Sequence, residues 1–284
     1  MILARLALGA AGAWAAYAWG AHLLTTGCVR RGPAARRAIA LTFDDGPDAV
    51  WTERILDILV HKHVRASFFL VGERAARVPE TVRRIAAAGH EIASHGWSHR
   101  SLWLCGPRRT EDEIGRAHHL LGSLAGRPPR FFRPPWGMVN AAMFGALRRH
   151  QERCVLWSIQ PEGLRPVAAA QQVGDVLHRA HPGAIVDLHD AEGTRGAPLR
   201  LVAALAPMID GMREMGYELV TVGDLLDGRE ADERAERVAD ATAPGDPAGR
   251  VVAMPTSDGA RGSARTRRPR RGGAGKPRRP SPSP

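Results

Sequence analysis

The sequence has only three cysteines, Cys28, Cys105 and Cys154, and no Cys-x-x-Cys pair among its 284 residues. This small number excludes a disulfide-rich framework and a four-cysteine zinc site, and it leaves room for one bridge. Aromatic residues make up only 5% of the chain, but 44% of all residues are hydrophobic. That apolar content is sufficient to bury a sizeable core, so the composition excludes a fully disordered protein.

Outside its C-terminal end, the chain has almost no net charge. The formal charge is +11, and nine basic residues lie in 261–284, where there is no acidic residue. Residues 1–260 therefore carry only +2, and such a nearly neutral part does not favour a domain that binds nucleic acid specifically. Residues 228–284 are first charged and then rich in Pro, Gly and Arg, which predicts a disordered tail that solubilises the chain or contacts anionic surfaces by charge alone.

Asp, Glu, Lys and Arg are also absent from residues 6–29. A helix needs about 20 apolar residues to cross the hydrocarbon core of a membrane, so we predict that residues 1–29 form a membrane anchor. Two alternatives stay open: a signal segment cleaved near residues 16–18 (Ala-Tyr-Ala), and an apolar helix buried in the core. Residues 25–28 (Thr-Thr-Gly-Cys) are also weakly similar to a lipoprotein processing site, although a Thr stands where an aliphatic residue is expected.

A basic linker is predicted at residues 30–37. Its arginines follow the apolar segment, and positive charge tends to stay on the cytoplasmic side of a membrane. This tendency favours a cytoplasmic domain, whereas the function predicted below favours a domain that is exported or anchored outside the cytoplasmic membrane.

Between residues 38 and 227, short apolar runs alternate with amphipathic stretches, which predicts one α/β domain. The predicted strands are 38–43, 66–71, 91–94, 130–133, 154–158, 184–188 and 218–222. The predicted helices are 50–61, 79–88, 110–124, 141–149, 167–179 and 199–215. We expect the third helix to begin at Thr110, which has capping-box spacing to Glu113. This alternation gives a parallel sheet with helices outside, and functional groups gather at the carboxyl ends of its strands.

Two adjacent carboxylates, Asp44 and Asp45, follow the first predicted strand and precede Gly46 and Pro47. Like charges this close repel each other unless a cation neutralises one of them. The turn therefore predicts a metal ligand beside a carboxylate that is free to act as a base. The alternative is an ordinary solvated Asp-Gly-Pro turn.

His95 and His99 follow the third predicted strand. A spacing of four residues points two imidazoles the same way if they share one turn of a helix. Two histidines and one carboxylate are a common site for a catalytic divalent metal. Other histidines, including the pair His118 and His119 and the single His90, are interpreted as surface or packing residues.

Arg133 and His189 stand at the ends of two later strands. Two prolines stiffen the turn after Arg133, and a guanidinium there can pair with the carboxylate base and orient it. The alternative for Arg133 is a surface residue of an ordinary turn. His189 can donate a proton to a leaving group, and either of two nearby carboxylates, Asp187 and Asp190, can tune its pKa.

Three motifs occur together in this order: Thr-Phe-Asp-Asp-Gly-Pro at 42–47, His-Gly-Trp-Ser-His at 95–99 and Arg-Pro-Pro-Trp-Gly at 133–137. They resemble the motifs of the polysaccharide deacetylase family, the NodB-homology carbohydrate esterases. The resemblance covers residues 38–226, which is nearly all of the predicted domain, and implies a deformed (β/α)7-type barrel. It also implies metal-dependent hydrolysis of N- or O-acetyl groups on a glycan such as peptidoglycan, and we expect a monomer.

The same resemblance implies a role for each matching residue. Asp44 would be the general base, and Arg133 would orient it. Three side chains would bind the metal, which is usually zinc in this family: Asp45, His95 and His99. His189 would be the general acid, and the backbone N–H of Trp136 would help to stabilise the oxyanion.

Three positions depart from the family pattern. Gly96 stands where the family often has Thr or Ser, and Asp187 stands where a Leu often lines the pocket for the acetyl methyl group. The Asp that often tunes the catalytic acid is absent, since Gly163 and Leu164 occupy its expected place. We hypothesise that Asp187 or Glu162 substitutes for it.

These departures leave two other functions open. A deacylase or deformylase of a lipid-linked sugar at the membrane would have a more polar acyl pocket, which suits Asp187. A non-catalytic glycan-binding homologue would tolerate the loss of the tuning residue. We expect no specific nucleic-acid partner, because only the tail is basic.

Overall fold

A computed structural model of the chain describes residues 2–20, 27–191 and 193–228. The predicted C-terminal tail lies outside the described residues, apart from Gly228. The N-terminal stretch starts with α1 (Ile2–Ala15), which continues into a short π-helix (Ala16–Gly20). Within the described ranges, no helix has both the length and the apolar character needed to span a membrane. Residues 21–26 of the predicted anchor are not among those described.

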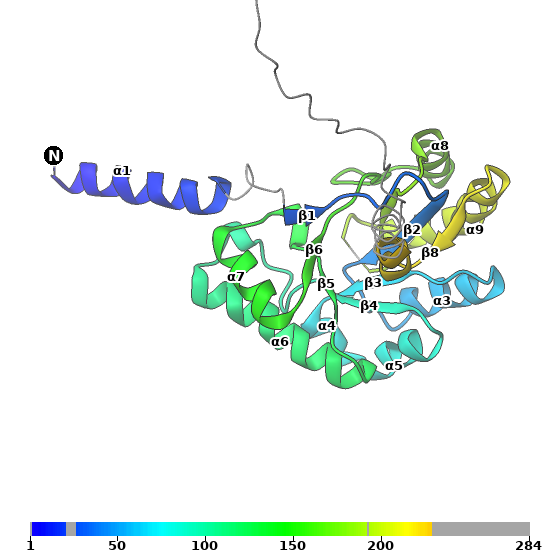
Figure 1. Ribbon diagram of the computed structural model, residues 1–284, viewed down its shortest axis with the longest axis horizontal. Helices are drawn as coiled ribbons and strands as arrows, with labels where there is room; N and C mark the ends of the chain where they lie inside the picture. The colour runs from blue at the N-terminus through cyan, green and yellow to red at the C-terminus, as the bar shows by residue number, and fades with distance from the viewer. Residues whose placement is uncertain (1, 21–26, 192, 229–284) are drawn as a thin grey trace, which may run out of the picture. The chain divides into compact units, whose positions relative to one another are not determined.

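One curled sheet forms the centre of the domain, and its strand pairings in the described part of the chain are all parallel (Figure 1). The strands are β1 (Cys28–Val29), β2 (Ala38–Asp44), β3 (Ser67–Leu70), β4 (Glu91–Ser94), β5 (Phe131–Phe132), β6 (Arg153–Val155), β7 (Ile185–His189) and β8 (Glu218–Val220). Their order is β1-β6-β5-β4-β3-β2-β7, and β8 pairs with the first residues of β2.

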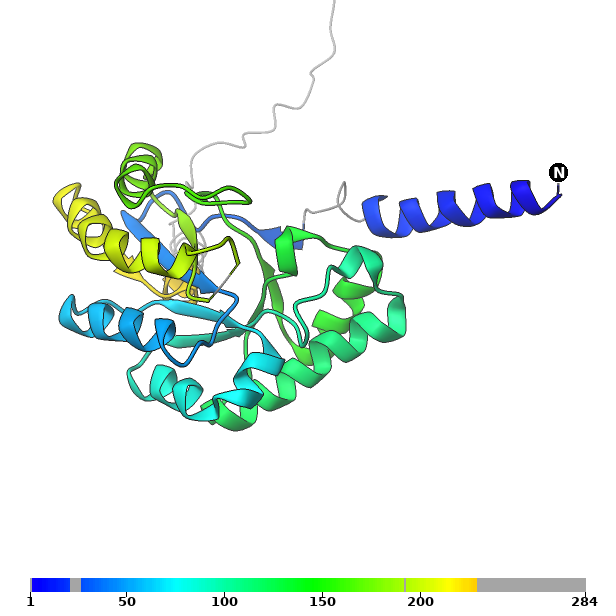
Figure 2. The ribbon, with the colours of Figure 1, turned by 180° about the vertical axis from the view of Figure 1, so that it is seen from behind.

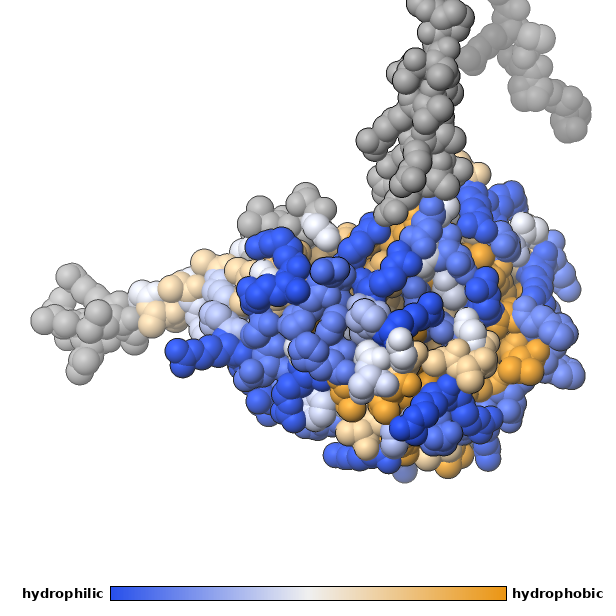
Figure 3. Space-filling view, turned by 60° about the horizontal axis from the view of Figure 1, so that its bottom comes forward, coloured by the Kyte–Doolittle hydropathy of each residue, from blue (hydrophilic) through white to orange (hydrophobic). Residues whose placement is uncertain are grey.

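Helices cover the outside of this sheet (Figures 1 and 2). They are α3 (Trp51–His61), α4 (Gly72–Arg77), α5 (Pro79–Ala87), α6 (Pro107–Ala125), α7 (Ala141–His150), α8 (Ala169–Arg179) and α9 (Ala197–Glu214). The predicted alternation of strands and helices is therefore confirmed, although the sequence pattern did not predict the short elements β1 and α4. Hydrophilic side chains dominate the face shown in Figure 3, with smaller apolar areas between them, as is usual for a folded protein.

The alternation of side chains along β2 explains why the Asp44 carboxylate faces the inside of the curled sheet. All seven residues of this strand are buried. Its large apolar residues belong to the main core with α3 and α9: Ile39, Leu41 and Phe43. Ala38 and Ala40 belong to a separate cluster. Because side chains alternate along a strand, Thr42 and Asp44 share the face of the two alanines.

The chain that follows β6 lies beside β7, the strand at the far end of the sheet. The N–H groups of Ser158 and Ile159 both donate to the carbonyl oxygen of Ile185, at 3.0 and 3.2 Å. The N–H of Asp187 donates in turn to the carbonyl oxygen of Ile159 at 2.9 Å. The sheet is thus curled into a deformed barrel, as the sequence predicted.

The expected capping box is wrong. α6 begins at Pro107, after Gly106, so Thr110 lies inside the helix. The Thr110 hydroxyl accepts a hydrogen bond from Asn140 Nδ2 at 2.9 Å, and Glu113 accepts two hydrogen bonds from Ser98. Tertiary partners satisfy these two side chains, and the local spacing alone could not indicate them.

Candidate active site

The candidate active site lies where three strands of the sheet end. Asp44 is the last residue of β2, His95 follows the last residue of β4, and His189 is the last residue of β7. A cleft of about 780 Å³ opens there, and its walls include six of the predicted site residues: Asp44, Asp45, His95, His99, Trp136 and His189. Parallel strands bring these residues together because their carboxyl ends meet at one side of the sheet.

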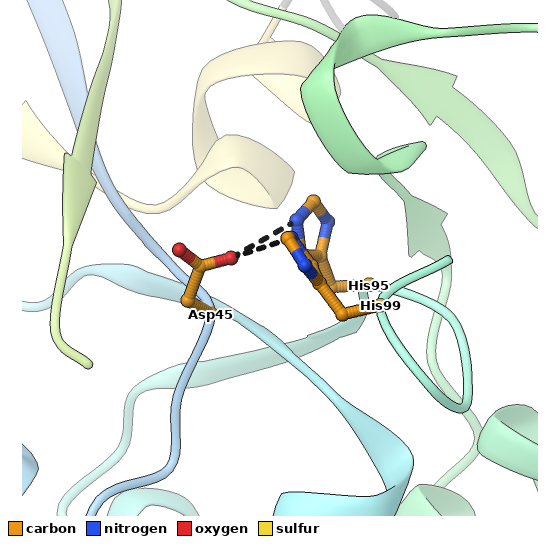
Figure 4. A group of neighbouring side chains, drawn as sticks. All are labelled: Asp45, His95 and His99. Carbon is orange, nitrogen blue, oxygen red and sulfur yellow. Dashed lines mark ion pairs between the residues drawn. The ribbon is translucent and has the colours of Figure 1, made fainter. Parts of the chain in front are cut away.

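Asp45, His95 and His99 turn their polar atoms toward one another (Figure 4). One potential ligand atom from each lies within 4.8 Å of the others. Asp45 Oδ1 is 2.8 Å from His99 Nε2 and 3.6 Å from His95 Nε2. Two imidazoles and one carboxylate fit a divalent transition metal and leave further coordination positions for water and substrate.

A hydrogen bond selects which nitrogen of His95 faces this group. His95 Nδ1 lies 2.7 Å from the carbonyl oxygen of Arg133. A carbonyl oxygen only accepts, so in the neutral imidazole Nδ1 carries the proton and Nε2 has the lone pair. A partner of this kind fixes the ring of a metal-binding histidine, so the surroundings of His95 also fit a metal site.

The two histidines are not on a helix, which corrects the geometry predicted from their spacing. They lie on a loop in which Gly96 and His99 have φ of 80° and 54°. The start of α4 supports this loop, since Gly72 N–H donates to the Gly96 carbonyl at 2.9 Å. From α6, Glu113 accepts hydrogen bonds from both the N–H and the hydroxyl of Ser98. Positive φ is uncommon outside glycine, so these contacts hold His99 in an otherwise unfavourable conformation.

Asp45 also has positive φ, at 75°, in the turn after β2. The next residue must be small, because a Cβ at Gly46 would lie 2.2 Å from Asp190 Oδ2. Asp190 is fully buried. Its carboxylate accepts hydrogen bonds from Gly46 N–H at 3.0 Å and from the Thr52 hydroxyl at 2.6 Å. Asp190 therefore fixes the turn that carries Asp45, and no hydrogen bond or ion pair within the described residues joins its side chain to His189.

Arg133 is completely buried beneath the cleft. Its Nη1 lies 2.6 Å from Asp44 Oδ1 and 3.1 Å from Asp187 Oδ1. The same nitrogen donates to the Thr42 hydroxyl, while Nε and Nη2 donate to the carbonyl oxygens of Val155 and Leu156. The guanidinium is thus fixed on several sides, and it holds one oxygen of the Asp44 carboxylate.

The register of β2 and β7 explains why the predicted base and acid are neighbours. Asp44 lies opposite His189, and Thr42 lies opposite Asp187. Opposite residues of parallel strands point to the same face, so all four side chains face the interior of the curled sheet.

Burial and charge shift the pKa values of these groups in different directions. Burial raises the pKa of Asp44 well above its usual range, against the lowering effect of Arg133. Burial alone would also raise the pKa of Asp45, but the imidazoles of His95 and His99 lower it below its usual range. Burial lowers the pKa of His189, but the carboxylates of Asp187, Asp45 and Asp44 raise it above its usual value.

Trp136 forms part of the cleft wall. It lies in a short 3-10 turn (Pro135–Gly137) and has φ of 55°. Its side chain is 50% exposed, and its indole lies 4.5 Å from the His99 ring, centroid to centroid. An exposed aromatic side chain beside the candidate metal ligands suits the apolar face of a sugar ring, in addition to the backbone role predicted from the sequence.

A family model described as polysaccharide deacetylase matches residues 31–155. A peptidoglycan-N-acetylglucosamine deacetylase of Bacillus cereus is 33% identical over 215 residues, which cover 76% of this chain and 76% of the relative. This chain belongs to the polysaccharide deacetylase family. A second relative of this family, a chitooligosaccharide deacetylase of Bradyrhizobium, is 33% identical over 192 residues, which cover 64% of this chain and 88% of the relative.

The fold agrees with that of a solved member of the polysaccharide deacetylase family. The Bc1960 peptidoglycan N-acetylglucosamine deacetylase superposes with a TM-score of 0.68 at 32% identity, covering 73% of this chain and 96% of the other. The predicted NodB-type barrel and the assignment to a family of glycan-deacylating hydrolases are therefore confirmed. The family match ends at residue 155, before His189, so the placement of His189 rests on the register of β7 described above.

Asp187 and Glu162 are the two residues hypothesised to substitute for the missing tuning residue, and their contacts differ. Asp187 contacts Arg133, accepts a hydrogen bond from Gln160 Nε2 at 2.9 Å and raises the pKa of His189. Glu162 instead forms an ion pair with Arg200, and Gln172 donates a further hydrogen bond to it. Asp187 therefore belongs to the charged group of the cleft, whereas Glu162 joins the segment after β6 to α8 and α9.

The cleft wall also includes residues that the sequence did not indicate, among them Arg74, Met138, Gln160 and Arg195. Arg74 donates to the carbonyl oxygen of Asp45 at 2.7 Å. Gln160 contacts Asp187 as described above. None of these residues lies in a recognisable motif, because each reaches the cleft only through folding of its loop or short helix.

Proposed function

We propose that this chain is a metal-dependent deacetylase that hydrolyses N-acetyl groups on a glycan, with peptidoglycan or another N-acetylhexosamine polymer as substrate. The observation that carries the proposal is the convergence of Asp45, His95 and His99 beside Asp44 and His189 in one cleft. The names of the relatives, which are peptidoglycan and chitooligosaccharide deacetylases, support the class of substrate.

The metal is proposed to be zinc, bound by Asp45 Oδ1, His95 Nε2 and a ring nitrogen of His99. This donor set and the fixed tautomer of His95 support the assignment. When bound, a zinc ion supplies Lewis acidity, which makes water a better nucleophile near neutral pH and polarises an acyl carbonyl.

Asp44 is proposed to be the general base, acting through Oδ2. Its other oxygen, Oδ1, is held by Arg133 at 2.6 Å. Oδ2 lies 3.8 Å from His95 Nε2 and therefore faces the metal ligands. As the water oxygen bonds to the acyl carbon, Oδ2 takes one proton from that water. Arg133 acts as a positioning residue, because its contacts fix the carboxylate without reaching the cleft.

His189 is proposed to be the general acid. When the carbon–nitrogen bond breaks, the departing nitrogen needs a proton, because an amine anion is a very poor leaving group. The neighbouring Asp187 stabilises the imidazolium form that donates this proton. We propose that Asp187 replaces the missing tuning residue of the family, since its carboxylate supplies the negative charge from β7 instead of from the loop after β6.

The Trp136 backbone N–H is proposed to stabilise the oxyanion that forms on the acyl oxygen. Trp136 has a left-handed backbone conformation, which is uncommon for a residue other than glycine. Backbone strain of this kind is concentrated at functional sites. The exposed indole would pack against the sugar ring on the same side.

The contacts of Asp187 also bear on the alternative function with a polar acyl pocket. Its carboxylate is buried and accepts hydrogen bonds from Arg133 and Gln160. A paired carboxylate does not require a polar acyl group, so no separate observation favours a lipid-linked sugar as substrate. We propose an exported location, with the catalytic domain outside the cytoplasmic membrane and residues 1–29 as its anchor, because peptidoglycan lies there.

The proposal is tested by acetate release from N-acetylglucosamine oligomers and from peptidoglycan by the full chain. Acetate and free amine should appear in equal amounts, a chelator should abolish the reaction, and zinc should restore it. His95→Ala should be inactive, whereas the matched control His178→Ala changes an exposed residue of α8 and should keep full activity. Metal and glycan binding without acyl release from either substrate would contradict the proposal and favour the non-catalytic alternative.

A further inference from the structure

The two-residue strand β1 pairs with β6 at one edge of the sheet, and this pairing places two cysteines opposite each other. Cys28 is the register partner of Cys154, and Val29 is the partner of Val155. Neighbouring strands lie about 4.8 Å apart, which is within the range of roughly 4.4–6.8 Å between Cα atoms that a disulfide spans. Opposite residues of parallel strands also point to the same face, so the two thiols are directed to the same side.

Both cysteines are free thiols, and the side chain of each affects the pKa of the other. Cys154 is buried in an apolar cluster between the sheet, α6 and α7, and Cys28 packs against the same cluster. The third cysteine has a different partner, since Cys105 Sγ lies 3.5 Å from the carbonyl oxygen of Ser101. One pair of thiols is therefore arranged for a bond, and Cys105 provides an internal control.

The two thiols differ in reactivity. Cys28 is half-buried, and its contact with Cys154 and the nearby Arg30 lower its pKa. Cys154 is buried, and burial raises its pKa well above the usual value. Because the thiolate is the nucleophile, Cys28 is the residue expected to react first with an external oxidant.

We propose that Cys28 and Cys154 form a disulfide bond when the chain meets a thiol–disulfide oxidant. The Cys28 thiolate attacks one sulfur of the oxidant's disulfide and displaces the other sulfur as a thiol. Cys154 then loses its proton and attacks Cys28 Sγ, which displaces the second thiol of the oxidant. The chain loses two electrons and two protons, and the oxidant gains them as two thiols.

This bond would fasten the strand that supports Arg133. Val29 accepts a hydrogen bond from Leu156 N–H at 2.7 Å. The carbonyl oxygens of Val155 and Leu156 in turn accept hydrogen bonds from the guanidinium of Arg133. The disulfide would therefore tie the N-terminal strand covalently to the backbone that fixes the orienting arginine.

The test compares the full chain after incubation with oxidised glutathione and after incubation with dithiothreitol. Each sample is unfolded, treated with iodoacetamide and analysed by mass spectrometry. The reduced sample should carry three alkyl groups, whereas the oxidised sample should carry one, on Cys105, and a peptide joining Cys28 to Cys154. Cys105→Ser should still form the bond, and Cys28→Ser should not. The oxidised chain should also melt on the order of 5–10 °C higher than the reduced one, because the bridge closes a long loop.

Three results would overturn the inference. Three alkylated cysteines after oxidation would show that the opposed thiols do not bond, and a bridge that includes Cys105 would show that the pairing is wrong. A lipid attached to Cys28 in the chain isolated from cells would also exclude the bridge, because the sulfur cannot hold both groups. These outcomes are independent of acyl release and so leave the proposed function untouched.

Discussion

The wall of the cleft that carries Asp45, His95 and His99 is made of turns, whereas the wall that carries Asp187 and His189 is a regular strand. In the first wall, Asp45 and His99 both have positive φ, and contacts from α4 and α6 hold the loop in place. In the second wall, the register of β7 with β2 aligns the functional residues without unusual backbone.

The two walls differ in how their function depends on sequence. The candidate metal ligands lie on turns that need particular neighbours, such as a small residue at Gly46, so each of their motifs is contiguous and easy to recognise in the sequence. A tuning charge needs only to lie near the imidazole, since electrostatic interaction acts over several ångströms. Such a charge can come from another strand, and we propose that Asp187 supplies it from β7.

The largest effects should come from the first wall. Asp45→Asn should remove the metal and the activity together. Asp44→Asn should keep the metal and lower kcat about 10³-fold, because it removes the base and leaves the ligands intact. Metal content of the purified variants, measured together with acetate release, separates the two roles. Asp48→Asn is the matched control, since Asp48 accepts hydrogen bonds at the start of α3 and should bind metal as the wild type does.

A smaller effect is expected from the second wall, where the two competing carboxylates can be compared. Asp187→Asn should lower the pKa of His189 toward its usual value, since it removes the largest charge that raises it. His189 must be protonated to act as an acid, so activity is lost as pH rises through its pKa. The alkaline limb of the pH–rate profile should therefore move to lower pH, and kcat near neutral pH should fall roughly tenfold.

Glu162→Gln is the matched control for this experiment. It breaks the ion pair with Arg200, whose side chain is mostly buried, and should lower the free energy of unfolding by about 2 kcal/mol. Its pH–rate profile should stay that of the wild type. A shifted alkaline limb in this variant, and not in Asp187→Asn, would assign the tuning role to Glu162.

The smallest expected effect is on the pH dependence of stability, and it comes from Asp190, which holds the turn that carries Asp45. Burial raises the pKa of Asp190 to about 7, so the folded state keeps this proton at pH values where the unfolded chain has lost it. The contribution of Asp190 to the free energy of unfolding is therefore fully present below the ordinary pKa of an Asp, and it is lost as pH rises toward 7. Between pH 5 and 7, the free energy of unfolding of Asp190→Asn should therefore fall less steeply than that of the wild type, by about 1 kcal/mol per pH unit. Urea unfolding at several pH values measures both slopes. Equal slopes in the two proteins would show that Asp190 does not titrate in this way.

The sequence predicted most of the fold because its apolar periodicity is strong. The strand at 38–43 and the helix at 199–215 were placed to within a few residues, since long buried runs leave few other choices. The capping box at Thr110 was wrong because a spacing rule does not include partners such as Asn140 and Ser98. The short elements β1 and α4 were missed, since two or six residues carry too little periodicity to be distinguished from a loop.

By itself, the sequence determined the family, the parallel α/β architecture and the identity of the residues that converge on the candidate metal site. Only the tertiary structure decided that His95 and His99 lie on a loop, that Asp187 and not Glu162 contacts Arg133, and that Cys28 lies opposite Cys154. The physical reason is distance along the chain. Motifs and periodicity record interactions between near neighbours, whereas the register of β7 with β2 and of β1 with β6 joins residues more than a hundred positions apart.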